Sequence, residues 1–317
     1  MKKFIIKRLL VALIIFLGVS IFIFIILQLQ PGNPYLNSLN PNISQEQTKQ
    51  ILMQKGYYDP LPVKFIKWFK GFITFDFGYS IQYKEPVVDV ILSRLPKTLM
   101  LTIPSLFLSL IFSFPIGMYM AYKPSKFVSK LMNIINLAAV SLPTFLIAIL
   151  LIKWLSFDLN LFPISGTGEL EDSGFQLALY SVLPIITLTI MQSTVFIRYI
   201  RGYFQRELTE QYYLVAQGFG MTRWQALVHS IFPTVLPQMI TLIFMEIPAL
   251  FSGALITETV FVWPGIGKLN YDAVTYRDYP LIMGLLSMTV GVVLLSNLAA
   301  DILGIQLNPL SKKEMSD

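Results

Sequence analysis

Long apolar stretches without Asp, Glu, Lys or Arg are the feature of this sequence that most restricts its fold. Several of them are as long as the roughly 20 residues that cross a bilayer as a helix, and one more is interrupted only by Glu246. Charged residues make up 13% of the chain, whereas a soluble domain carries about 25%. We therefore expect an all-α membrane protein with about six transmembrane helices. The expected spans are 9–29, 99–122, 131–152, 177–197, 234–257 and 279–300.

The basic residues alternate between rich and poor connections along the chain. The N-terminus, 123–130 and 198–232 are rich in Lys and Arg, whereas 156–176 has none and 258–278 has only two. Basic residues concentrate in short cytoplasmic connections of membrane proteins. The pattern therefore predicts that both termini and the two rich loops are cytoplasmic.

These boundaries divide the chain into four parts. We expect an N-terminal transmembrane helix (1–30), an extracytoplasmic segment (31–98), a core of five transmembrane helices that includes the cytoplasmic loop 198–237 (99–308) and a cytoplasmic tail (309–317). The extracytoplasmic segment is itself basic, but long loops cross the membrane regardless of charge. Its aromatic-rich stretch DPLPVKFIKWFKGF, residues 59–72, predicts an amphipathic helix that either lies at the membrane interface or packs against other helices.

The cytoplasmic loop 198–237 has the pattern of a folded element. Gly220 interrupts a helical pattern, and Thr222 followed by Gln225 forms the signature of a capping box. A short apolar stripe follows and ends at Pro233. This stripe lies below the membrane, so it either needs a groove on a partner or folds back onto the chain's own helices. The stripe residues are Trp224, Leu227, Val228 and Ile231.

A second candidate element is ETVFVWPGIGKL, residues 258–269. Its Gly265, Gly267 and Lys268 resemble part of a phosphate-binding loop, but the spacing G-x-x-x-x-G-K-[ST] is absent, as is G-x-G-x-x-G. The chain itself is therefore not expected to bind a nucleotide. Pro264 and the glycines predict a sharp turn, and Trp263 suits the membrane interface.

Several of these motifs resemble one family. Ala216, Gly220 and Pro233 have the A-x3-G-x12-P spacing of the "EAA" loop in membrane subunits of ATP-binding-cassette importers. The glutamate that the family carries in this loop falls on Leu214, with Glu210 as the candidate substitute. ETVFVWPGIGKL followed by RDYP, together with LQPGNP, FDFGYS, RLPKTL, SLPTF and NLAADI, resembles the permease subunits of peptide and nickel importers, such as the B-type subunit of oligopeptide and dipeptide permeases.

The resemblance implies a type I importer permease in a bacterial cytoplasmic membrane. Such a chain forms half of a pathway for peptides, nickel or metallophores, beside a second permease, a solute-binding protein and ATPase subunits that hold ATP and Mg. It implies no catalytic residue, cofactor or metal in this chain. The expected ATPase-coupling residues are Ala216, Gly220, Thr222, Arg223, Trp224, Leu227 and Val228. The expected translocation-path residues are Glu246 and Ser252. The expected extracytoplasmic-loop residues are Glu258, Trp263, Pro264, Gly265, Gly267, Arg277 and Asp278.

Two other classes of membrane protein fit the sequence less well. A self-sufficient secondary transporter usually carries several ionisable residues in mid-membrane, whereas only Glu246 lies deep within a span here. An intramembrane metalloprotease needs several histidine ligands, and the chain has one His and no Cys.

Overall fold

A computed structural model describes residues 2–29, 45–54, 56–124, 126–166, 174–252 and 254–307. The expected tail 309–317 and most of the LQPGNP motif lie outside these residues. The described part consists of helices and their connections, with one isolated β-bridge between Tyr79 and Pro86. Among the described residues, five helices are long and apolar enough to cross a membrane, or up to six if a bent pair counts as one span. The all-α membrane architecture expected from the sequence is thus confirmed. The main helices are α1 (Lys2–Leu29), α3 (Leu61–Ile73), α4 (Val87–Tyr122), α5 (Phe127–Ser141), α6 (Thr144–Leu151), α7 (Gly174–Glu207), α10 (Phe232–Ser252) and α13 (Tyr279–Leu307).

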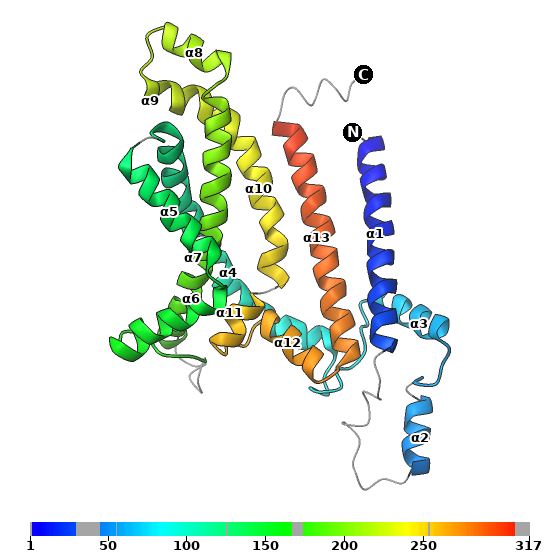
Figure 1. The fold of residues 1–317 in the computed structure, drawn as a ribbon. Helices are drawn as coiled ribbons and strands as arrows, with labels where there is room; N and C mark the ends of the chain where they lie inside the picture. The colour runs from blue at the N-terminus through cyan, green and yellow to red at the C-terminus, as the bar shows by residue number, and fades with distance from the viewer. Residues whose placement is uncertain are drawn as a thin grey trace.

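Helices α4 and α7 pack along each other at the centre of the fold (Figure 1). One face of α4 carries a small residue at every fourth position, and all of these residues are buried. Small side chains let two helix backbones approach closely where the hydrophobic effect gives no drive for association. A Cβ at Gly117 would lie 2.8 Å from a methyl carbon of Ile200 on α7. The stripe consists of Ser105, Ser109, Ser113, Gly117 and Ala121.

Helix α1 packs against α13, and α3 packs against α1. Arg8 of α1 and Asp301 of α13 form an ion pair of 3.0 Å. On α3, the ring of Phe72 lies 4.5 Å from that of Phe16, between centroids. The amphipathic helix expected at 59–72 therefore exists, and its aromatic side packs on α1.

The span expected at 131–152 is broken into two helices. Helices α5 and α6 meet at an angle of 103°. Leu142 between them is extended, with φ −83° and ψ 133°, as expected for a residue that precedes a proline. Pro143 lacks the N–H that would continue α5. The apolar run is continuous in sequence, but its proline divides the helix.

Helix α4 begins at Val87, twelve residues before the expected start at 99. Its 36 residues extend about 54 Å at 1.5 Å per residue, well beyond the ~30 Å hydrocarbon core. The end of the expected extracytoplasmic segment is therefore part of this helix. At the other end of the core, α10 stops at Ser252, and a separate helix α11 (Leu255–Val260) contains the last residues of the span expected at 234–257.

Two sets of elements lie at opposite ends of the long helices. The start of α1 and the end of α13 lie at the same end as α8 (Gln211–Gly218) and α9 (Arg223–Ala226), whereas α3, α11 and α12 (Ile266–Thr275) lie at the other end (Figure 1). The charge pattern predicts that the first end is cytoplasmic.

Single cysteines can test this orientation because the chain contains none. Ser165 and Thr209 are both exposed: Ser165 precedes Gly166, whose N–H bonds to the carbonyl of Phe261 after α11, and Thr209 lies two residues after the end of α7. An impermeant thiol reagent added to intact cells should label Ser165→Cys and miss Thr209→Cys, while both variants react after the membrane is opened. The reverse pattern would contradict the predicted orientation.

Candidate functional site

The stretch 254–281 is organised around the buried carboxylate of Glu258. This side chain on α11 is 0% exposed. It accepts hydrogen bonds from the hydroxyl of Thr98 on α4 at 2.9 Å and from the backbone N–H of Lys268 at 3.0 Å. The Thr98 hydroxyl oxygen in turn accepts the N–H of Ile266 at 2.7 Å. A carboxylate is favourable at the N-terminus of a helix, where backbone N–H groups lack partners. Glu258 therefore joins α11, α12 and α4.

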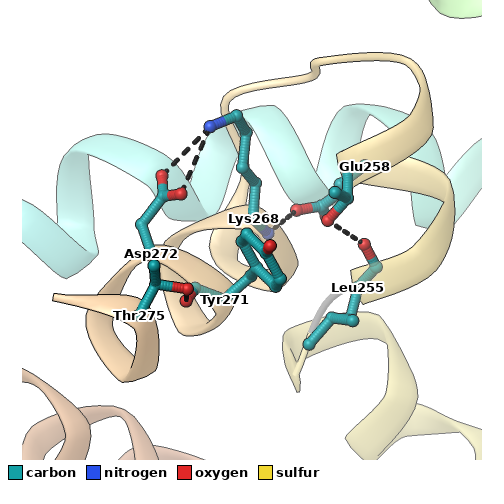
Figure 2. Close-up of polar contacts among 7 residues, drawn as sticks. Leu255, Glu258, Lys268, Tyr271, Asp272 and Thr275 are labelled. Atoms are coloured by element: carbon teal, nitrogen blue, oxygen red, sulfur yellow. Dashed lines mark hydrogen bonds and ion pairs between the residues drawn. The ribbon is translucent and has the colours of Figure 1, made fainter. Parts of the chain in front are cut away.

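This arrangement explains the glycines that resemble a phosphate-binding loop. A Cβ at Gly265 would lie 2.5 Å from both Glu258 Oε2 and Thr98 Oγ1, and one at Gly267 would lie 2.6 Å from the backbone N of Leu255. Figure 2 shows the backbone of Lys268 bonded to Glu258 while its ammonium group points away to Asp272. The helix N-terminus that would hold a phosphate in a nucleotide-binding loop holds the chain's own carboxylate.

Trp263 lies inside the protein, so its expected place at the membrane interface is wrong. Its side chain is 0% exposed, and its indole N–H donates to the backbone carbonyl of Lys97 at 2.9 Å. The Trp263 N–H bonds to the carbonyl of Glu258 at 2.8 Å, and Val262 has a φ of 53°. The sharp turn expected here therefore folds the indole back onto α4. Pro264 follows it and is half-buried.

Asp278 lies in the connection between α12 and α13, as expected, and is a second fully buried carboxylate. It caps α13 by accepting the N–H of Leu281 at 3.2 Å, and it also accepts from the hydroxyl of Ser80 at 2.5 Å and the N–H of Gln82 at 3.0 Å. The FDFGYS and RDYP motifs are thus in contact through this side chain. Sequence reasoning missed Ser80 and Thr98, although both lie in motifs that carry the resemblance. Arg277 beside Asp278 is exposed.

At the opposite end, α8 and α9 form the expected folded loop. Gly220 between them has a φ of 89°, which favours glycine. The capping box is confirmed: Gln225 N–H donates to Thr222 Oγ1 at 3.3 Å, and the Thr222 N–H donates to Gln225 Oε1 at 3.0 Å. Arg223 opens α9 and is exposed.

The apolar stripe is divided between the chain's own core and the surface. Leu227 and Ile231 are fully buried against α4, α7 and α10. Ala216 belongs to the same cluster and is 9% exposed. Trp224 is 48% exposed, with its ring 6.0 Å from that of Tyr122 on α4. Trp224 belongs to a group of exposed apolar side chains on α8, α9, the connection between them and the start of η3 (Leu227–Ile231), here named the docking surface. Its members are Leu214, Val215, Phe219, Met221, Trp224 and Val228.

Pro233 does not end this helix, contrary to expectation. The chain stays helical from α9 through the π-helical turn η3 (Leu227–Ile231) into α10. A proline in a regular α-helix collides with the carbonyl four residues earlier. The wide turn η3 contains that residue, His229, and so makes room for the ring.

The start of the loop is anchored by Tyr212. Its hydroxyl donates to the carboxylate of Glu207, the buried last residue of α7, at 2.6 Å. Burial and this hydrogen bond raise the pKa of Tyr212 to about 12. The phenol therefore keeps its proton at physiological pH and continues to donate.

Glu246 and Ser252 both lie on α10. Glu246 is half-buried and forms no hydrogen bond or ion pair with the described residues. Ser252 is the last residue of the helix and is half-buried. The structure leaves the Glu246 carboxylate available to a group outside the described chain.

Comparison with known proteins gives the family. The model for "binding-protein-dependent transport system inner membrane component" matches residues 113–312, and the model of its N-terminal region matches 1–102. This chain belongs to that family. It is thus an integral membrane component of a binding-protein-dependent transport system.

Full-length relatives support this assignment. The oligopeptide transport system permease protein AppB of Bacillus subtilis is 33% identical over 98% of this chain and 99% of its own length. The glutathione transport system permease protein GsiC of Escherichia coli K12 is 30% identical, with 98% of each chain covered. A chain of the MetNI methionine ABC transporter, in inward-facing form, superposes with a TM-score of 0.55 at 17% identity and covers 70% of this chain and 97% of its own. The fold is that of a type I importer permease.

The close packing around Glu258 predicts how the two glycines of this family member respond to substitution. Gly267→Ala should destabilise the protein by about 1–3 kcal/mol, because its Cβ would meet the Leu255 backbone and force the helices apart. Thermal unfolding in detergent would measure the loss. Gly291→Ala on α13 is the matched control, since no atom lies within 4 Å of its Cβ position. An equal effect of both substitutions would contradict the packing argument.

Proposed function

We propose that this chain forms half of the translocation pathway of a bacterial peptide importer, with both termini in the cytoplasm. The observation that carries the proposal is full-length similarity to permeases whose names state oligopeptide or glutathione transport. A second permease subunit completes the pathway, and a solute-binding protein delivers peptide to the side that bears α11 and α12. Separate ATPase subunits hold ATP and Mg, so this chain catalyses no reaction itself. Family membership disfavours a self-sufficient secondary transporter.

The docking surface is the contact with an ATPase subunit. Phe219 is 86% exposed and directly follows α8, which lies with α9 at one end of the long helices (Figure 1). Contiguous exposed apolar side chains mark interaction sites. Thr222 and Gly220 shape the loop, Arg223 adds a charge at the rim, and Ala216 and Leu227 hold it against the core. The last two thus support the contact from inside the chain.

This division of roles predicts two different mutant phenotypes. Trp224→Ala and Phe219→Ala should reduce transport and substrate-stimulated ATPase activity about tenfold or more, because aromatic anchors dominate interface energies. Both variants should insert and unfold normally. Leu227→Ala should instead lower the unfolding temperature, since a buried leucine contributes about 2–5 kcal/mol. Normal coupling in both aromatic variants would exclude this surface as the ATPase contact.

Glu246 and Ser252 line the translocation path on α10. An ionised carboxylate is costly in hydrocarbon, so an unpaired one faces water, substrate or another subunit. The amino terminus of a peptide offers the complementary charge. The half-buried state of Glu246 and its lack of a partner among the described residues support this role.

The variant Glu246→Gln keeps size and hydrogen bonding but removes the charge. We expect peptide uptake in proteoliposomes to fall several-fold while subunit assembly and basal ATPase activity persist. Uptake of a peptide with an acetylated amino terminus should be affected less, because it lacks the cation. Unchanged uptake of both peptides would exclude a charged contact, and failed assembly would assign Glu246 to a subunit interface.

A further inference from the structure

A small crevice lies beside the Glu258 region at the end of the molecule that holds α12. It has a volume of about 70 Å³ and opens between α4, the turn at 80–86 and the start of α12. Its polar lining is Tyr83, Arg94, Lys268 and Asp272, and the remaining walls are Pro264, Gly265 and Leu269. The volume suits a carboxylate group at the end of a longer molecule.

The crevice holds one guanidinium, that of Arg94, which is in direct ion-pair contact with none of the described side chains. The ammonium of Lys268 is paired with Asp272 at 3.0 Å. Half-buried Arg94 forms no hydrogen bond or ion pair with any residue that the structure describes. Burial and the Asp272 carboxylate raise the pKa of Tyr83, and the Arg94 guanidinium opposes this shift, so these groups are close enough to interact. A guanidinium that is partly removed from water and lacks a counter-ion favours an anion.

The helix N-terminus beside the crevice does not supply the site. Its N–H groups are taken by Glu258 and Thr98. Arg94 and the Tyr83 hydroxyl are the available donors, and the planar guanidinium matches the two oxygens of a carboxylate. Asp272 excludes a second negative charge, so the crevice suits a monoanion.

We propose that Arg94, with Tyr83, binds a carboxylate that arrives at this face during import. This inference rests on the proposed function, which supplies two sources of the same chemistry. One is the C-terminal carboxylate of the transported peptide, and the other is an acidic side chain of the docking solute-binding protein. In either case the carboxylate is the counter-ion that Arg94 lacks among the described residues.

The test uses the assembled importer in proteoliposomes, with a peptide and its C-terminal amide as substrates. Arg94→Cys should lower uptake of the free-acid peptide by about tenfold, the usual effect of losing a hydrogen bond between charged groups. A cationic methanethiosulfonate should then restore uptake, and the neutral methyl reagent should not. This chain has no other thiol, and the wild-type complex treated with each reagent is the control for the other subunits. Lys70→Cys, on the exposed face of α3, is the matched control for loss of a positive charge.

The two sources give different outcomes. If the peptide carboxylate binds, uptake of the amide is unaffected by Arg94→Cys, and the binding protein docks normally. If the binding protein supplies the carboxylate, both substrates are affected equally and docking weakens. Uptake and docking that do not change, or equal rescue by the neutral reagent, would overturn the proposal.

If Arg94→Cys does not assemble, a second measurement on the wild-type complex tests the same proposal. Phenylglyoxal modifies arginines, and mass spectrometry reports the reaction at Arg94 of the wild-type complex. Acetate should slow this modification at least twofold and acetamide should not, and equal rates would also overturn the proposal. A wild-type complex that imports no peptide but shows protection by acetate would contradict the proposed function and not the carboxylate site.

Discussion

The hydrogen bonds of Glu258 hold together the part of the molecule that surrounds residues 258–269. One carboxylate with no exposure to solvent satisfies a backbone N–H at the start of α12 and the hydroxyl of Thr98 on α4. The backbone of the turn between α11 and α12 must lie close to the Glu258 carboxylate for these bonds to form. This requirement explains the two glycines and the position of the Trp263 indole. An unpaired buried carboxylate would be strongly destabilising, so these residues depend on one another.

Much of the architecture follows from composition and local pattern. Apolar runs of membrane length predict the spans, and Thr222 with Gln225 predicts the cap of α9, because both signals are contained within a few turns of helix. The bend at Pro143 also has a local cause, but a continuous apolar run conceals it. The repeat of small residues from Ser105 to Ala121 is also visible in the sequence, but it played no part in predicting the spans. This repeat is the face of α4 that packs against α7.

The remaining features depend on contacts between residues far apart in sequence. Nothing in the sequence near Trp263 indicates that its indole N–H donates to the carbonyl of Lys97. Nothing near Asp278 indicates that its carboxylate accepts a hydrogen bond from Ser80. The amphipathic stripe after Gly220 shows the same limit. Its period predicts one apolar face, but the division between buried Leu227 and exposed Trp224 depends on how α4 and α7 end beside it. Local sequence gives the stripe, and tertiary packing decides which part remains available to a partner.

Helix α4 touches both the Glu258 region and the docking surface. Thr98, about a third of the way along the helix, is bonded to Glu258, and Tyr122 at its last turn lies against Trp224. These two contacts are 24 residues apart on one continuous helix, about 36 Å along its axis. A tilt of α4 as one body would displace both contacts at once, whereas a bend at Pro104 or Pro115, which lie between them, would displace one contact without the other. Helix α4 therefore connects the docking surface to the Glu258 region, and its prolines are the places where that connection can bend.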